Sequence, residues 1–139
     1  MADTVRQVQY FSIDVPDKPG EAFRVLQTLV SSGINLLACS GHTVRRRARI
    51  DVVPDDTDAF KAATAKASLA FTATKSGFLV QGEDRPGALA QNLQRLASTG
   101  INVTGIDAMG AGAGRWGAIL WVKPEDVSRA ASALGALEK

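Results

Sequence analysis

Two copies of a short acidic turn carry the residues best suited to bind a small polar molecule. Residues 17–20 read Asp-Lys-Pro-Gly, and residues 84–87 read Asp-Arg-Pro-Gly. Each motif follows an alternating apolar stretch and precedes a helical pattern, which predicts a strand-to-helix turn. Such a turn exposes N–H groups at the positive end of a helix, where a carboxylate or phosphate can bind. The structural alternative is that Asp caps the helix, Pro fixes φ and Gly allows close backbone approach.

A second motif, Gly-Ile-Asn, follows each predicted helix at residues 33–35 and 100–102. We expect Asn35 to begin the next strand near the same edge of the module as the Asp17 turn. Its amide could offer one donor and one acceptor to a polar ligand. It could equally be a turn residue that ends the helix.

Both motifs belong to an internal repeat with an offset of 67 residues. Between residues 17–36 and 84–103, ten of twenty positions are identical without a gap. The repeat predicts two related modules in tandem, over residues 1–75 and 76–139.

The patterns around these motifs predict the same elements in each copy. In the first copy we expect strands over 9–15, 34–40, 48–53 and 69–74, with helices over 19–32 and 59–67. The apolar side of the first helix is formed by Ala22, Phe23, Leu26, Leu29 and Val30, and Gly33 ends the helix. The second copy predicts strands over 78–82, 101–109 and 116–122, a helix over 86–98 and a final helix from Pro124.

This order predicts an α+β fold of two ferredoxin-like βαββαβ modules, each an antiparallel sheet with helices on one face. The second module lacks its last strand, which would leave the edge at 78–81 uncovered. We expect strand 69–74 to turn tightly at 75–77 and pair with 78–81 as well as with the first strand. That pairing would give one seven-stranded sheet; the alternative is a strand supplied by a partner subunit.

A strand, Asp-x-Pro-Gly, an amphipathic helix, Gly-Ile-Asn and then βαβ resemble the pattern of ACT domains, twice over nearly the whole chain. The resemblance implies a regulatory module that binds an amino acid, is usually dimeric, and holds its ligand at interfaces between modules. It also implies ligand contacts from the turn and from the Asn after Gly-Ile. On this basis the candidate ligand-binding residues are Asp17, Lys18, Gly20, Asn35 and Leu36, with Asp84, Arg85, Gly87, Asn102 and Val103 in the second copy.

Two further motifs have weaker functional interpretations. Residues 112–117 spell G-x-G-x-x-G, but they lie between two predicted strands and not at the start of a helix, so we expect a hairpin there. The basic run at 45–49 is expected to be a solvated hairpin tip. RNA binding is its rival, although the third strands lack the paired aromatic residues of an RNA-binding sheet.

Composition excludes several classes of function. The chain has 139 residues, 45% of them hydrophobic, and a formal net charge of +2, which predicts no strong attraction to nucleic acid or to a membrane. One cysteine and one histidine exclude an internal disulfide and a Cys/His metal set. No secretory signal or membrane span is present, which predicts a cytoplasmic protein. No catalytic set or cofactor motif is recognisable, so we expect neither an enzyme nor a bound cofactor.

Ile119 and Trp121 are expected on the sheet face that no helix of the chain covers. Large apolar side chains left in water usually mark an interface, so we expect a homodimer or larger assembly. The sequence therefore favours a small-molecule, amino-acid-binding regulatory protein that acts through ligand-linked conformation or assembly, and possible partners include a metabolic enzyme. The alternative is a protein–protein adaptor without a ligand.

Overall fold

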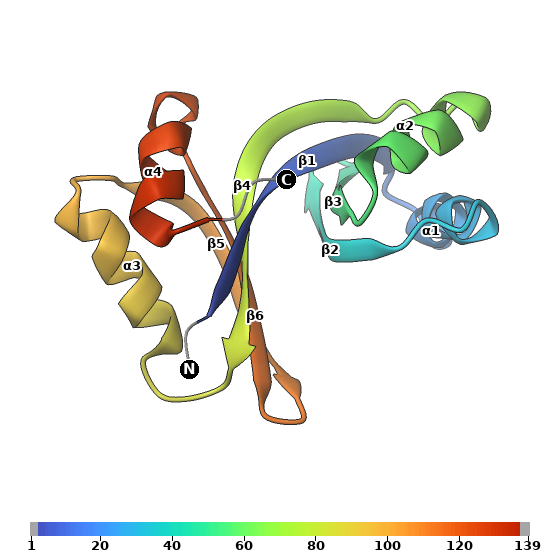
Figure 1. Cartoon of the computed structure of the whole chain (residues 1–139). Coiled ribbons are helices and arrows are strands. Elements are labelled where there is room, and N and C mark those ends of the chain that lie inside the picture. The colour runs from blue at the N-terminus through green and yellow to red at the C-terminus, as the bar shows by residue number, and fades with distance from the viewer. Residues whose placement is uncertain (1–2, 137–139) are drawn as a thin grey trace. The chain divides into compact units, whose positions relative to one another are not determined.

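The computed structural model describes residues 3–136, apart from the side chain of Thr74 (Figure 1). The elements in chain order are β1 Thr4–Pro16, α1 Glu21–Ser31, β2 Leu36–Val44, β3 Arg47–Pro54, α2 Thr57–Lys66, β4 Thr72–Glu83, α3 Ala88–Ser98, β5 Val103–Gly112, β6 Arg115–Val122, the 3-10 turn η1 Pro124–Asp126 and α4 Val127–Leu134. They form two compact units. The first module contains residues 9–75, and the second module contains residues 3–8 together with 76–136.

In the first module the strands follow the order β2-β3-β1-β4, and α1 and α2 pack on one face of them. β1 and β3 are antiparallel, with Phe11 opposite Val52 and Ile13 opposite Ile50. These alternate side chains point to the same face, where they form a core with Val25, Leu29 and Phe60.

Helix α1 buries a different side from the one predicted. Val25 and Leu29 are fully buried, whereas Phe23 is 68% exposed and Val30 is 63% exposed. The predicted apolar side was therefore wrong for Phe23 and Val30. Val25 and Leu29 are four residues apart and lie on the inner side of the helix, while Phe23 and Val30 are seven apart and lie together on the outer side.

The first half of β1 supplies the strand that the second module lacks. The second module has the strand order β1-β4-β6-β5, and only residues 4–8 of β1 belong to it. Val5 is 3% exposed and packs in the same core as Phe78, Val80 and Leu120. Residues 3–8 therefore join the second module, whereas the sequence had placed them in the first; the units still divide between residues 75 and 76.

The expected shared-strand arrangement is wrong. Residues 75–77 form no hairpin, because β4 runs without a break from Thr72 to Glu83. The described sheet consequently has six strands and not seven. The prediction failed because residues 75–77, Lys-Ser-Gly, suit a tight turn in sequence but lie inside the strand.

The predicted helix end at Gly33 is confirmed. Gly33 ends α1 with φ of +73°, its N–H donates to the Val30 carbonyl at 2.9 Å, and the Ile34 N–H donates to the Leu29 carbonyl at 3.0 Å. This Schellman motif recurs at Gly100. The predicted hairpin at 112–117 is also confirmed, since β5 and β6 are joined through residues 113 and 114.

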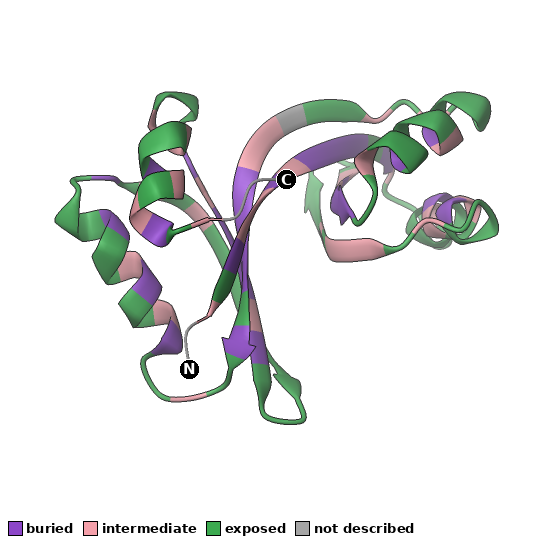
Figure 2. Ribbon diagram, viewed as in Figure 1, coloured by how far each residue is buried: buried purple, intermediate pink, exposed green. Residues whose placement is uncertain are grey.

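The outer strands β2 and β5 contain no buried residue (Figure 2). In β6, Leu120 and Val122 face the helices as predicted. Ile119, however, is 4% exposed, so the expectation that it lies in water is wrong. Trp121 is half-buried, and its indole lies so close to Gly105 that a Cβ there would collide with the ring.

We predict that Val5→Ala lowers the free energy of unfolding by about 2 kcal/mol, because it removes buried methyl groups from the core of the second module. Val44→Ala is the control, since Val44 is 50% exposed and should change stability by less than about 0.5 kcal/mol. Urea denaturation measures both. Equal effects of the two substitutions would show that residues 3–8 are not part of this core.

Candidate functional site

The two Asp-x-Pro-Gly motifs fold into the same tight turn. The Glu21 N–H donates to the Lys18 carbonyl at 3.3 Å, and the Ala88 N–H donates to the Arg85 carbonyl at 3.3 Å. Gly20 has φ +87° and ψ −12°, while Gly87 has φ +83° and ψ +4°. A positive φ at the third position and Pro at the second define a type II turn, and Gly is the residue that tolerates this geometry.

Neither Asp of these turns caps a helix, which corrects the structural interpretation made from the sequence. Helices α1 and α3 begin at Glu21 and Ala88, directly after Gly20 and Gly87, and neither helix has a side-chain cap. Asp17 lies three residues before Gly20, outside the helix start. Asp17 and Asp84 are both exposed.

Each turn therefore presents an exposed carboxylate beside an uncapped helix N-terminus. A carboxylate can accept hydrogen bonds from an ammonium group. The first-turn N–H groups of a helix, together with the helix dipole, favour a bound anion. An α-amino acid carries both of these charged groups.

The Asn residues lie at the other end of each module from the turns. Pro16, next to the Asp17 turn, is paired with Arg47, which is opposite Val44 at the far end of β2. Asn35 instead precedes Leu36, at the start of β2. The eight steps from residue 36 to 44 correspond to about 26 Å at the usual rise of a strand. The expectation that Asn35 and the Asp17 turn share an edge is therefore wrong.

The same separation holds in the second module. Glu83, next to Asp84, is paired with Arg115 and so lies near Gly112 at the end of β5, whereas Asn102 precedes the first residue of β5. Asn35 and Asn102 are exposed, and Leu36 and Val103 are half-buried. Within one module, therefore, a small ligand cannot contact the Asp turn and the Asn at once.

Arg85 differs from its counterpart Lys18 because its guanidinium is already engaged. Its Nη1 donates to Asp3 Oδ1 at 3.0 Å and its Nη2 donates to Asp3 Oδ2 at 3.1 Å. The same group also donates to the Glu83 carbonyl and to Gln91 Oε1. Lys18 is exposed. Of the two turns, only the first presents an exposed cation.

Asp3 is the centre of a polar network within the second module. Besides the two bonds from Arg85, it accepts one from Asn92 Nδ2 at 2.9 Å and one from Trp116 Nε1 at 3.1 Å. Its side chain is 6% exposed. Gly82 makes room for it, since a Cβ at that position would collide with a carboxylate oxygen and lie 3.0 Å from the carboxylate carbon.

Burial raises the pKa of Asp3, but the hydrogen bonds from Arg85, Asn92 and Trp116 and the charge of Arg85 outweigh burial and lower it to about 2. This network was not predicted from the sequence. The usable signal was Asn92, which occupies the buried side of α3 between Ala88 and Leu96. A polar side chain at such a position requires a partner.

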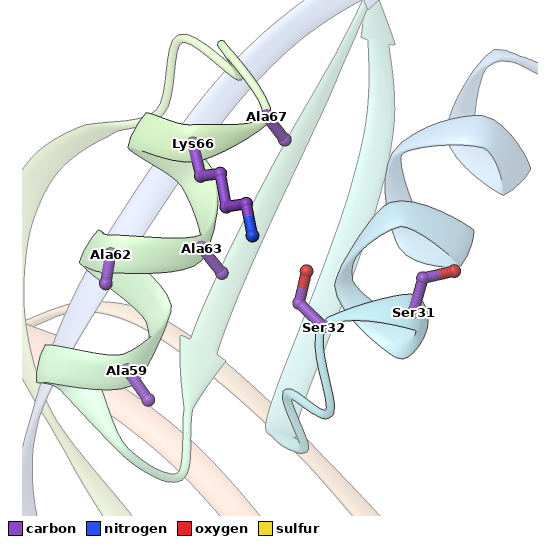
Figure 3. A pocket seen from close by; sticks show the side chains of 7 residues that line it. All are labelled: Ser31, Ser32, Ala59, Ala62, Ala63, Lys66 and Ala67. Atoms are coloured by element: carbon purple, nitrogen blue, oxygen red, sulfur yellow. The ribbon is translucent and has the colours of Figure 1, made fainter.

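A separate groove of 640 Å³ lies between α1 and α2 of the first module (Figure 3). It is lined by Ser31, Ser32, Ala59, Ala62, Ala63, Lys66 and Ala67. None of the predicted site residues lines it. Its walls are mostly methyl groups, and Lys66 is the only charged group among them, so we assign no ligand to it.

Within residues 3–136, no three His, Cys, Asp or Glu side chains are placed to hold a metal ion. No helix of this described part is long and apolar enough to cross a membrane.

Residues 78–139 match the family model of the ACT domain. No curated protein matches the chain in sequence. Among solved structures, protein BT0572 from Bacteroides thetaiotaomicron superposes with a TM-score of 0.77 and 20% identity, covering 96% of this chain and 88% of its own. The ligand-free regulatory subunit of aspartate kinase from Thermus thermophilus gives a TM-score of 0.63 and 21% identity, covering 97% and 95%.

Aspartokinase III of E. coli, in complex with lysine and aspartate, gives a TM-score of 0.56 and 15% identity over 96% of this chain and 32% of its own. These likenesses establish an α+β fold of the ACT type. The family match places an ACT domain within this fold at residues 78–139.

We predict that Asp3 makes stability depend on acid pH. Its folded pKa of about 2 lies below the ordinary value of 3.8, so its contribution is complete above pH 4 and is lost as the pH falls toward 2. The difference corresponds to about 2 kcal/mol. Denaturation from pH 7 to pH 2 should show this loss in the native protein. Asp3→Asn should be less stable at pH 7 and show a smaller loss, whereas Asp14→Asn, at an exposed position, should behave like the native protein.

Proposed function

We propose that the protein is a regulatory module that binds an amino acid at its Asp-x-Pro-Gly turns. The observation that carries this proposal is the pairing, in both turns, of an exposed Asp with an uncapped helix N-terminus. The Asp would accept from the ligand ammonium, and the helix N–H groups would donate to the ligand carboxylate. The amino acids in the E. coli aspartokinase III complex support this ligand class.

The first module is the stronger candidate for the primary site. Lys18 is exposed there and can add a positive charge near the ligand carboxylate. In the second module Arg85 is held by Asp3, so its turn relies on Asp84 and the backbone near Gly87. The two turns should therefore differ in affinity.

Regulation would follow from linkage between binding and conformation or assembly. β1 ends next to the Asp17 turn, while its residues 4–8 belong to the second module. A ligand that favours one arrangement of this strand shifts the equilibrium by its difference in affinity for the two states. Since Asp17 and Asn35 lie at opposite ends of their module, a homodimer would allow one copy to supply the turn and another the Asn. A metabolic enzyme is the partner class we propose for the regulation, in a reduced cytoplasmic setting.

A thermal-shift screen of the twenty amino acids tests the proposal. We expect a small subset to raise Tm, and Asp17→Asn to abolish most of the shift because it removes the charge that pairs with the ammonium. Asp14→Asn, an exposed Asp on β1, is the matched control and should leave the shift unchanged. If no amino acid raises Tm, the adaptor alternative is favoured.

Asn35→Ala provides a second test of the ligand contacts. We expect it to weaken binding of an amino acid found in that screen by about 1–3 kcal/mol, the cost of an unpaired polar group. Isothermal titration calorimetry measures the affinity, and sedimentation of the same variant shows whether assembly is retained. Unchanged affinity would show that Asn35 does not contact the ligand, and the assignment of the Asp17 turn would stand.

A further inference from the structure

The β2–β3 hairpin of the first module ends in two arginines with unusual backbone geometry. Arg45 and Arg46 have φ of +50° and +68°. A two-residue turn of this kind requires positive φ at both positions and favours Asn or Gly. The β5–β6 hairpin has the same geometry with Ala113 and Gly114 at φ +54° and +71°. The first module thus has two long charged residues where the fold itself favours small ones, a form of local strain that often accompanies function.

The hairpin is strongly and uniformly basic. Residues 36–50 contain four arginines, one histidine and no acidic residue. Within residues 3–136, Arg45 and Arg46 form no ion pair or hydrogen bond through their side chains. Arg49 is held in place by bonds to Asp51 Oδ1 at 3.3 Å and Ser12 Oγ at 3.1 Å.

Next to these charges, β2 presents an unpaired strand edge. Among residues 3–136, β2 is the outer strand of the first module and is paired only with β3. Its outward backbone N–H and C=O groups can therefore hydrogen-bond to an added strand. Val44, the last residue of β2, is 50% exposed beside the arginines.

We propose that the β2 edge docks an extended acidic segment of a partner protein, which adds a strand to the first module. The backbone bonds would provide affinity, and the arginines would select acidic side chains. In the hairpin, His42 is opposite Arg49 and Val44 is opposite Arg47, so these four side chains share one face. An added strand presents every second side chain to that face. The partner segment should thus carry its acidic residues at alternate positions.

Other edges and other polyanions fit less well. β5 is also an outer strand, but its only charged residue is Asp107. Single-stranded RNA requires exposed aromatic side chains for base stacking. The aromatic residues of β1, Tyr10 and Phe11, are each 3% exposed, which makes an acidic peptide the better match.

The test uses the full chain and a blocked peptide of sequence Glu-Thr-Glu-Thr-Glu-Thr, with a fluorescent label for anisotropy. The decisive variant is Arg45→Asn with Arg46→Gly, which removes two charges and also relieves the left-handed backbone. We expect Tm to rise while the Kd for the peptide weakens by about tenfold. A loss of binding in a more stable protein cannot be attributed to unfolding.

A charge-matched control is Arg95→Gln with Arg115→Gln, two exposed arginines of the second module. We expect its Kd to stay within about twofold of the native value, since these charges are not at the hairpin. A peptide N-methylated at all six residues should bind more weakly, because it has no N–H left to donate to the strand edge in either strand direction.

Several outcomes would overturn the proposal. Strand addition by an acidic segment would be contradicted if the decisive variant bound the peptide as tightly as the native protein does. It would also be contradicted if the native protein bound the N-methylated peptide, or a Gln-Thr peptide, as tightly as the Glu-Thr peptide. Binding of a decauridine RNA in place of the peptide would identify a nucleic-acid surface. Self-association that the decisive variant abolishes, without peptide binding, would identify a second copy of the chain as the occupant. No binding of the peptide by the native protein would also reject the proposal.

Discussion

The second module depends on the hydrogen bonds that the buried carboxylate of Asp3 accepts. A carboxylate that is 6% exposed is costly to bury unless nearly all of its hydrogen-bonding capacity is used. Four donor bonds, from Arg85, Asn92 and Trp116, meet that requirement. Gly82 leaves the space that the carboxylate occupies. These contacts fix residues 3–8 beside β4 and complete a sheet that the second half of the chain cannot complete alone.

This arrangement makes β1 and β4 common to both modules. β1 has residues 4–8 in the second module and 9–16 in the first, while β4 has residues 72–75 in the first and 76–83 in the second. Neither module is therefore a continuous piece of the chain. The Asp17 turn follows the last residue of β1, while residues 4–8 of the same strand belong to the second module.

What the sequence could predict was decided by distance along the chain. The strand-to-helix turns, the helix end at Gly33 and the hairpins after β2 and β5 depend on residues only a few positions apart, and the sequence predicted each of them. The local turn predicted at 75–77 failed because its residues are also compatible with a strand. The partners of Asp3 lie 82 to 113 residues away, so no local pattern could indicate them except Asn92 on a buried helix face. The separation of Asp17 from Asn35, by contrast, follows from the topology alone. A helix that connects two parallel strands of one sheet must begin at one end of the sheet and finish at the other, so Asp17 and Asn35 cannot meet within a module.

The two copies share a backbone but use it for different chemistry. Where the second module has Arg85 and Asn92 to hold Asp3, the first has Lys18 and Val25 at the same repeat positions. Trp116 of the second module corresponds to Ala48 of the first. Trp116 is opposite Gly82 and Ala48 is opposite Val15, and residues 82 and 15 are equivalent in the repeat. The first module needs no such network to hold an extra strand segment, because residues 72–75 of β4 already lie beside its strand β1. One copy thus uses its turn cation to complete its sheet. The other leaves Lys18 exposed and places two more cations, Arg45 and Arg46, at its hairpin tip, so the chemistry available to external partners is concentrated in the first module.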